Sequence, residues 1–342
     1  MASNLLFVNA EDLTIERRKS GKSWQYRRAD GSIITDAEEV ARLNRIALPP
    51  AYSSGRFCPD PSGHIQAVGI DARGRSQYRY HPDYRASRDS AKYDRCVQFG
   101  QALPKLRARV ARDLKGNPLA YNTVVAAIVR ILDTGRLRIG NEAYARSNKS
   151  FGVTTLRNRH ARVDRKSLNL KYRAKSGIMR AVTFEDKAVL RVVRRCQELR
   201  GQNLFQYLDA SGRISQVTSG DVNDYLRAVT GEDFTAKDFR TWGGTVVAYA
   251  ELCAAHERGE QPGIRSIAEM VATELGNTAT IARKSYIHPR VIELVTEKLP
   301  TPARKPRTSK WLSAAERGVL ALLAESGPKE SLLQILRASQ SV

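Results

Sequence analysis

The chain has few residues suited to disulfide bonds or metal binding. Its 342 residues include 4 cysteines and 5 histidines. The cysteines (Cys58, Cys96, Cys196 and Cys253) stand far apart and form no C-x-x-C pair. Such spacing excludes a zinc finger and predicts reduced, mostly buried thiols in a cytoplasmic protein. We therefore expect no metal site.

Long hydrophobic runs are also absent. No apolar segment approaches the ~18 residues of a membrane helix, since the longest candidate, Val124–Leu132, is interrupted by Arg130. The first residues lack the basic region of a signal peptide. Hydrophobic residues nevertheless make up 42% of the chain, which is enough to bury a core and excludes a wholly disordered protein. We expect no membrane association and one large or two modest domains.

Acidic residues are scarce relative to basic ones. The chain has 57 Lys and Arg against 35 Asp and Glu, a net charge of +22. Solubility alone needs only about 2–8 charges in a small domain. Such an excess favours an anionic partner, and the usual one is the backbone of a nucleic acid.

The N-terminal ninety residues have the pattern of short strands and turns. Asp30-Gly31 is a hairpin turn signal between Trp24–Arg28 and Ser32–Thr35. A second hairpin is predicted from Ile65–Ile70 and Ser76–His81. Between them, Asp36 is expected to cap a helix over Ala37–Leu48, which Pro49-Pro50 stops.

Helical periodicity dominates beyond about Asp89. It predicts helices over Cys96–Leu114, Ala120–Leu132, Phe184–Leu199, Val222–Val229, Ala236–Glu257 and Ile264–Leu275. Val153–Leu156, Ser167–Tyr172 and Met179–Thr183 are predicted as three short strands, the last two joined across Lys175-Ser176-Gly177.

These patterns predict an α+β protein. We expect a small β-rich N-terminal lobe over residues 1–90 and a mainly helical domain with a small three-stranded sheet over 91–300. Residues 301–342 are expected to form a basic, proline-containing linker (Leu299–Lys310) and a helical tail (Trp311–Gln340) broken at Gly327-Pro328.

The excess charge is concentrated in two segments. Residues 136–180 contain thirteen Lys and Arg and two acids, half of the net charge of the chain. Residues 73–92 add six basic residues against two acids, interleaved with Tyr78, Tyr80 and Tyr84. Basic residues neutralise phosphates, and the tyrosines can contact bases or sugars. A solvated charged face and, for Tyr78 and Tyr80, a strand packed on a core are the simpler interpretations.

Five short motifs occur in order along these regions. They are Gly69-Ile70-Asp71-Ala72-Arg73-Gly74-Arg75-Ser76-Gln77-Tyr78, Arg136-Leu137-Arg138-Ile139-Gly140-Asn141, Lys175 at a predicted hairpin tip, Lys237-Asp238-Phe239-Arg240-Thr241-Trp242-Gly243, and Leu275-Gly276-Asn277-Thr278 followed by Ala282-Arg283-Lys284-Ser285-Tyr286. Cleaving a phosphodiester without water or metal needs a protein nucleophile, cations for the phosphate and a proton donor for the leaving oxygen. The motifs contain all three kinds of group.

This ordered set resembles the small, poxvirus-like type IB DNA topoisomerases of bacteria, over about residues 10–300. The resemblance implies a C-shaped clamp on duplex DNA that relaxes supercoils through a 3′-phosphotyrosyl intermediate, with neither ATP nor metal as cofactor. By position, Tyr286 would be the nucleophile, Arg138 and Arg240 would stabilise the phosphate, and Lys175 would be the general acid. Asn277 stands where many relatives have a histidine, and an amide can donate the same hydrogen bond but cannot titrate.

The resemblance also implies a DNA-binding surface in the N-terminal lobe. Its candidate residues are Arg73, Arg75, Gln77, Tyr78 and Tyr80, to which the helical domain adds Lys237 as a phosphate contact. We expect a monomer in the cytoplasm, associated with the nucleoid.

Several assignments have rivals nearby in the sequence. Arg240 could instead pair with Asp238 or Glu251 on a helix surface. Arg136 is the rival of Arg138, and Lys171 and Arg173 are the rivals of Lys175, because a one-residue slip of the hairpin would exchange them. His160 and His288 are expected to be structural or surface residues, and Gly74 and Gly177 turn residues.

Two other functions compete with the topoisomerase. A tyrosine recombinase shares the Arg, Lys, Arg, Tyr chemistry, but recombinases generally place histidine three residues before the second arginine, where this chain has Lys237. A non-enzymatic nucleic-acid-binding protein would explain the charge of +22 but not the spacing of Tyr286 and its cations.

Overall fold

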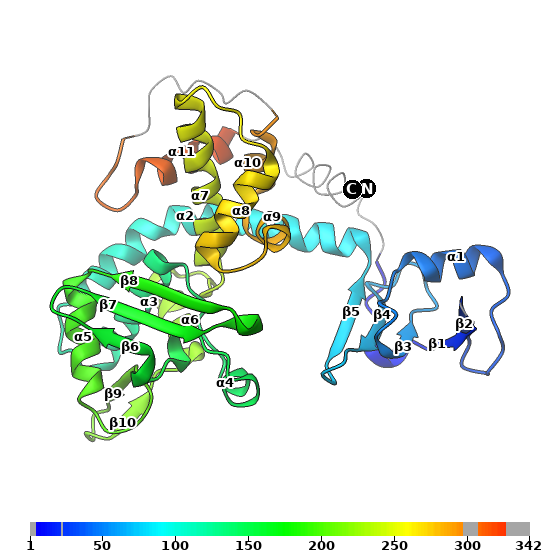
Figure 1. Ribbon diagram of the computed structural model, residues 1–342, viewed down its shortest axis with the longest axis horizontal. Helices are drawn as coiled ribbons and strands as arrows, with labels where there is room; N and C mark the ends of the chain where they lie inside the picture. The colour runs from blue at the N-terminus through cyan, green and yellow to red at the C-terminus, as the bar shows by residue number, and fades with distance from the viewer. Residues whose placement is uncertain (1–4, 22, 297–306, 326–342) are drawn as a thin grey trace. The chain divides into compact units, whose positions relative to one another are not determined.

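A computed structural model describes residues 5–21, 23–296 and 307–325 (Figure 1). The described chain forms two compact units that divide between Lys92 and Tyr93. No described helix is long and apolar enough to cross a membrane. The fold is a mixture of helices and small sheets with a β-rich N-terminal part, so the predicted α+β class is confirmed.

The N-terminal unit is built on a five-stranded antiparallel sheet of order β2-β1-β3-β4-β5. Its strands are β1 Ile15–Ser20, β2 Ser23–Arg27, β3 Ser53–Phe57, β4 Ile65–Ile70 and β5 Ser76–Tyr80, with the 3₁₀ helix η1 Ala10–Asp12 and the helix α1 Ala37–Arg45. Asp36 caps α1 by accepting a hydrogen bond from the Glu39 backbone N–H at 2.7 Å. Leu43 of α1 joins Tyr26 and Phe57 in the core of this unit.

The second unit contains most of the helices. They are α2 Pro82–Asp113 (shared with the N-terminal unit), α3 Tyr121–Gly135, α4 Glu142–Asn148, α5 Lys187–Gln197, α6 Ser219–Thr230, α7 Asp238–Glu257, α8 Ile264–Leu275, α9 Ala279–Tyr286, α10 Pro289–Glu293 and α11 Ala314–Glu325, with the 3₁₀ turns η2 Val153–Thr155, η3 Asn158–His160 and η4 Lys175–Gly177. Its strands form the sheet β6 Ala161–Val163, β7 Leu168–Arg173 and β8 Met179–Phe184, and the pair β9 Gln206–Leu208 and β10 Ile214–Gln216.

The core of this unit surrounds α3. Val124–Val129, Ile131 and Leu132 are all at most 1% exposed, so the longest apolar run in the sequence is a buried helix. The β6-β7-β8 sheet lies beside α3 and α5 (Figure 1). A second apolar cluster joins α7, α8 and α9 and includes Leu275, Ala282 and Ile287, with Tyr286 packed against it.

One strand prediction is wrong. Val153–Leu156 is not a strand: Val153 N–H and Thr154 N–H donate to the carbonyls of Arg138 and Ile139, and the segment turns as η2. The third strand of the small sheet is β6 instead. The hairpin predicted around Asp30-Gly31 is present but short. The N–H groups of Arg28 and Ile34 donate to the carbonyls of Ser32 and Tyr26 around the antiparallel Arg27–Ile33 bridge. Along its length, β2 pairs with β1.

The other predicted elements occur at the predicted places in the chain, but several differ from the prediction in length. Helix α8 has the predicted bounds, whereas α2 begins at Pro82, well before Cys96, and α1 ends at Arg45 rather than Leu48. β1, β3, β9 and β10 and the helices α4, α9 and α10 were not predicted. α11 falls within the predicted helical tail, while 299–306 of the predicted linker and the break at Gly327-Pro328 lie outside the described residues.

Candidate active site

Tyr286 is the last residue of α9 and is half-buried. The helix begins after Thr278, whose side chain accepts a hydrogen bond from the Ile281 backbone N–H. The buried Ala282 anchors the helix from within, and the buried Ile287 fixes the chain directly after it. The phenol is therefore held by a helix end with apolar packing on both sides.

Arg240 of α7 lies against this phenol. Its guanidinium carbon is 4.9 Å from the centroid of the Tyr286 ring, and the residue is only 3% exposed. Nη1 donates to the Arg136 carbonyl at 2.5 Å and Nη2 to the Leu275 carbonyl at 3.0 Å. The alternative pairing with Asp238 or Glu251 is not found among the described contacts. Asp238 accepts from the Thr235 backbone, and Glu251 pairs with Arg258.

The charges around Tyr286 change its acidity. Burial alone raises the pKa of a phenol, but the positive charges of Arg240, Arg138 and Lys237 outweigh it, and the pKa of Tyr286 lies below its ordinary value of 10.0. Burial, and then the charge of Arg138, lowers the pKa of Arg240 itself. The site therefore makes Tyr286 easier to deprotonate than a free tyrosine, and the phenolate is the nucleophilic form.

Three arginines converge on the C-terminus of α8. Arg138 Nη1 donates to the Gly276 carbonyl at 3.2 Å, and Arg180 donates to the carbonyls of Thr273 and Glu274 at 3.0 and 2.7 Å. Together with the bond from Arg240 to Leu275, all four consecutive carbonyls are occupied. The partial negative charge of a helix C-terminus offsets the mutual repulsion of the cations. We call Arg138, Arg180 and Arg240 the arginine cluster.

The structure distinguishes Arg138 from its neighbour Arg136. Arg136 Nη1 forms an ion pair with Glu274 at 2.6 Å, so a carboxylate neutralises its charge. Arg138 belongs to the arginine cluster and acts on Tyr286. This arrangement favours Arg138 over Arg136 as a phosphate ligand.

Asn277 follows the left-handed Gly276 that ends α8. Its backbone N–H donates to the Ala272 carbonyl at 3.0 Å, but neither side-chain atom, Oδ1 or Nδ2, has a hydrogen-bond partner although both are buried. A buried amide without a partner costs free energy unless a ligand supplies one.

Lys175 lies at the tip of the β7–β8 hairpin, as predicted, and is exposed. The tip is a tight turn in which Ser176 and Gly177 have φ angles of 62° and 79°. Lys171 and Arg173 are also exposed. The charges that act most strongly on Tyr286 include Lys237 but not Lys175.

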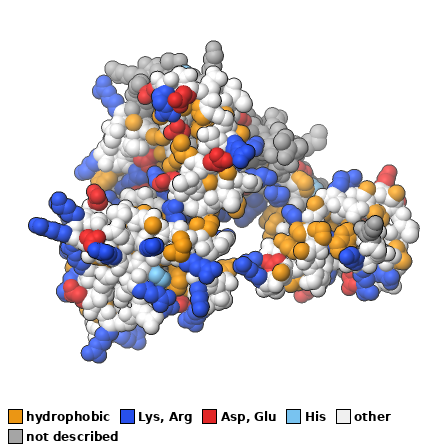
Figure 2. Space-filling view, in the orientation of Figure 1, with side chains coloured by type: hydrophobic (Ala, Val, Ile, Leu, Met, Phe, Trp, Pro, Cys, Tyr) orange, Lys and Arg blue, Asp and Glu red, His pale blue; other side chains and the backbone are white. Residues whose placement is uncertain are grey.

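Figure 2 shows Lys and Arg side chains exposed around the sheet that carries Lys175. Arg180 of that sheet was not among the sequence-predicted site residues. It belongs to the predicted basic segment, but only the tertiary contact with α8 distinguishes it from the other cations there.

The two histidines have structural contacts: His160 accepts from the Arg157 N–H, and His288 is buried and accepts from the Arg290 N–H.

The candidate DNA-binding residues of the N-terminal unit lie on the β4–β5 hairpin, whose turn contains Gly74 with φ 74°. Asp71 accepts hydrogen bonds from Arg75 and Gln77, and the bonds from Arg75 lower the pKa of Asp71 to about 2. Arg73 is exposed.

The tyrosines of β5 face solvent rather than a core. Tyr78 and Tyr80 are 41% and 40% exposed, and their rings stack at 6.2 Å. Tyr84 continues the row, 5.4 Å from Tyr80. The alternative of a strand packed on a core therefore does not hold for these two side chains.

Comparisons with known proteins cover both units. Residues 81–308 match the model of the eukaryotic DNA topoisomerase I catalytic core, and residues 23–71 match that of the bacterial DNA topoisomerase IB N-terminal domain. The chain is 29% identical over 291 residues to the DNA topoisomerase 1B of Acanthamoeba polyphaga mimivirus, covering 82% of this chain and 87% of the relative.

More distant viral relatives match a shorter part of the chain. The chain is 22% identical to the DNA topoisomerase I of Monkeypox virus and 21% identical to the DNA topoisomerase 1B of Vaccinia virus (strain Copenhagen), in each case over 68% of this chain and 72% of the relative. Because a family model matches more than half of the chain, and does so over the unit that contains Tyr286, the chain belongs to the type IB DNA topoisomerases.

Proposed function

We propose that Tyr286 is the nucleophile of a reversible DNA strand transfer that relaxes supercoiled duplex DNA. The Tyr286 oxygen attacks a backbone phosphorus, a 3′-phosphotyrosyl bond forms, and the bond from phosphorus to the 5′ oxygen breaks. The freed strand rotates, and the 5′-hydroxyl then attacks the phosphotyrosine, which restores the DNA and the enzyme. The phosphotyrosyl bond retains the energy of the phosphodiester bond that it replaces, so the cycle needs no external source of energy.

The observation that carries this proposal is the position of Tyr286 against the buried Arg240. Arg138 and the unpartnered Asn277 amide lie at the same end of α8 that Arg240 contacts. The pentacoordinate phosphorus gains negative charge on its oxygens. Arg138 and Arg240 would stabilise this charge, and the planar fork of a guanidinium can hold two phosphate oxygens. Asn277 Nδ2 would donate to a third oxygen.

Lys175 is proposed as the general acid that protonates the leaving 5′ oxygen. It is an exposed ammonium at a hairpin tip in the same unit as Tyr286. Lys237, whose charge lowers the pKa of Tyr286, is proposed as a phosphate contact. Arg73, Arg75, Gln77, Tyr78 and Tyr80 would contact the duplex from the N-terminal unit.

We further propose a monomeric enzyme that acts on DNA in the cytoplasm, associated with the nucleoid, as a clamp. The net charge of +22 supports a DNA partner. A tyrosine recombinase would need two partner sites, so relaxation of a plasmid without such sites distinguishes the two.

Tyr286→Phe tests the proposal because it removes one hydroxyl group. We expect the variant to bind duplex DNA nearly as well as the parent but to relax no supercoiled plasmid and to form no covalent complex. The matched control is Tyr207→Phe, which removes a hydroxyl from the β9 strand and should relax DNA at the parent rate. The assays are run in EDTA without nucleotide. Relaxation by Tyr286→Phe would refute the assignment of the nucleophile.

A further inference from the structure

The C-terminal helix α11 is built into the core of the unit that contains Tyr286. Val319 and Leu323 belong to the large apolar core around α3, and Leu322 belongs to the cluster of α7, α8 and α9 against which Tyr286 packs. A Cβ added at Gly318 would lie 2.5 Å from the Tyr249 ring of α7. Thus α11 lies directly on α7. All of α11 lies beyond the matched catalytic core, which ends at residue 308.

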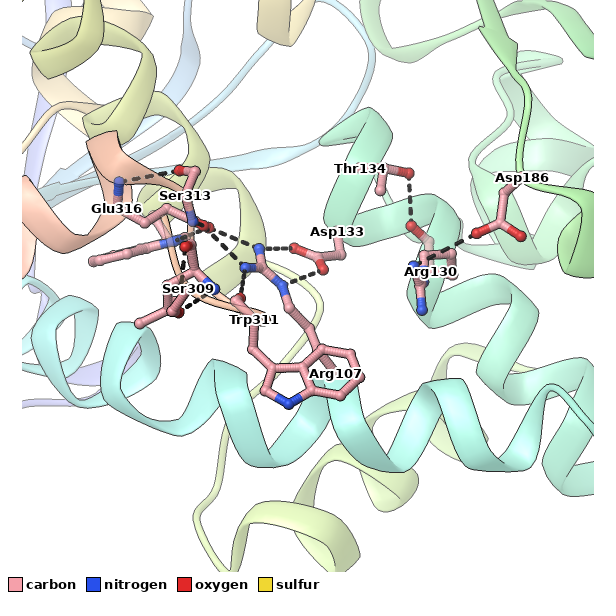
Figure 3. Close-up of polar contacts among 11 residues, drawn as sticks. Arg107, Arg130, Asp133, Thr134, Asp186, Ser309, Trp311, Ser313 and Glu316 are labelled. Carbon is pink, nitrogen blue, oxygen red and sulfur yellow. Dashed lines mark hydrogen bonds and ion pairs between the residues drawn. The ribbon is translucent and has the colours of Figure 1, made fainter. Parts of the chain in front are cut away.

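A single carboxylate attaches α11 to two other helices. Glu316 is 7% exposed and accepts from Arg107 of α2 at 2.7 and 3.0 Å. Arg107 also pairs with Asp133 of α3 at 2.7 Å and donates to the Trp311 carbonyl at 2.5 Å (Figure 3). The indole Nε1 of Trp242 donates to Glu316 Oε1 at 3.2 Å.

The two oxygens of Glu316 therefore accept four described hydrogen bonds. Oε1 accepts from Arg107 Nη2 and Trp242 Nε1, and Oε2 accepts from Arg107 Nη1 and the Ser313 backbone N–H. An amide in this position has one oxygen and one N–H₂ group, so it cannot accept all four bonds.

Trp242 connects this network to the candidate active site. It lies on α7 two residues after Arg240, and it is 2% exposed. A Cβ added at Gly100 of α2 would lie 2.4 Å from the Trp242 ring, so the indole is seated closely on α2. The next two residues of α7 make equally close approaches. A Cβ at Gly243 would lie 2.7 Å from Arg136, and a Cβ at Gly244 would lie 2.6 Å from the Tyr286 carbonyl.

We propose that Glu316 is a positioning residue for the strand-transfer reaction. Its hydrogen bond holds Trp242 in place. Because Trp242 lies on α7, this bond also fixes the position of α7, and with it the positions of Arg240 and of the Tyr286 backbone that packs on Gly244. The proposal rests on the proposed roles of Tyr286 and Arg240. Glu316 itself does not touch these two side chains and acts through α7.

Glu316→Gln is the test, measured in the full-length protein on a duplex oligonucleotide under single-turnover conditions. We expect the cleavage rate constant to fall about 10- to 100-fold, because a displacement of about 1 Å at a reacting centre costs up to about 100-fold. The dissociation constant for DNA should stay within about twofold, because the cations that contact DNA are unchanged. A purely structural role would lower thermal stability without this separation of cleavage from binding.

The chain offers a closely matched control in Asp113→Asn. Asp113 is the last residue of α2, and its side chain is 10% exposed like that of Glu316. It accepts hydrogen bonds from Arg109 and from an aromatic donor, Tyr225, and Arg112 adds an ion pair at 3.6 Å. This network has no contact with α7 among those described. We expect Asp113→Asn to lose thermal stability but to cleave DNA within about twofold of the parent.

Trp242→Phe provides a second test if Glu316→Gln does not fold. It removes the indole donor and leaves the pair between Glu316 and Arg107, so we expect cleavage to fall without a large change in DNA affinity. The double variant with Glu316→Gln should cleave DNA about as slowly as Glu316→Gln alone, because both changes break the same connection between Trp242 and Glu316. The proposal is wrong if Glu316→Gln, or Trp242→Phe in its place, cleaves at the parent rate. Cleavage by Tyr286→Phe would instead overturn the proposed function.

Discussion

Most of the buried polar atoms without partners belong to residues at the C-terminus of α8. Among the described residues, such side-chain atoms are Nε of Arg136 and Arg240, both amide atoms of Asn277, and Oδ1 of Asn158. Folded proteins rarely leave such atoms unsatisfied. Their position beside the arginine cluster is what the proposed role in binding a phosphate predicts.

Asn277 provides the prediction at this scale. Asn277→Ala should lower the cleavage rate about 100-fold, because losing one donor to a developing oxyanion costs about this much. Asn277→His should restore most of the rate and add a titration near pH 6.5, the ordinary pKa of histidine, that the parent lacks. Single-turnover cleavage measured across pH checks both. An Asn277→Ala variant that cleaves like the parent would show that this side chain does not face the phosphate.

The sequence predicted the individual site residues through their motifs, but not their contacts. Tyr286, Arg240 and Arg138 were assigned by their positions in motifs that resemble the type IB topoisomerases, and the structure brings them together. Arg180 and Glu316 carry no local signal. Their importance comes from partners 93 and 209 residues away in the chain, which periodicity and spacing do not encode.

At the scale of elements, prediction succeeded where the local pattern and the end signals agree. Helix α8 has its predicted bounds because its apolar periodicity stops at Gly276, a left-handed C-cap with φ 60°. Val153–Leu156 was predicted as a strand, and three of its four residues are β-branched, which favours strands. All four residues are buried, and the segment pairs its backbone with a loop. The eight residues of α9 are too few for a clear helical period.

Helix α11 gives the prediction at this scale, through the titration of Glu316. Burial raises the pKa of this carboxyl, but the hydrogen bond and charge of Arg107 outweigh it, and the pKa lies below the ordinary value of 4.5. A lowered pKa means that Glu316 contributes stability above pH 4.5 and loses it as the pH falls through the folded-state value.

Thermal unfolding of the parent and of Glu316→Gln should therefore differ most above about pH 6. The difference in melting temperature should shrink as the pH falls below 4.5, because the parent then loses the same charge. A difference that is constant across this range would show that the carboxylate charge does not hold α11.

At the scale of the whole molecule, charge is the dominant property. Half of the net charge of +22 is carried by residues 136–180, the segment that contains Arg138, Lys175 and Arg180. Such an excess opposes compactness through self-repulsion and favours binding to a polyanion. The motifs and composition therefore indicated the same partner before the fold was known.

The salt dependence of DNA binding tests whether this positive charge contacts phosphates. The affinity of Tyr286→Phe for duplex DNA, which isolates non-covalent binding, should fall steeply with ionic strength. Each neutralised phosphate contributes a slope of about −0.9 in a plot of log affinity against log salt. Fluorescence anisotropy with a labelled duplex over a range of salt measures this slope. An affinity independent of salt would contradict binding through phosphates.

The central claim is that one phenolic oxygen, that of Tyr286, forms the covalent bond to DNA. The most direct measurement traps the covalent complex on a duplex labelled at its 3′ side, digests the protein and identifies the peptide joined to the DNA by mass spectrometry. We predict a single peptide with the 3′-phosphate on Tyr286, and no adduct from Tyr286→Phe. An adduct on any other residue, or a 5′ linkage, would contradict the account.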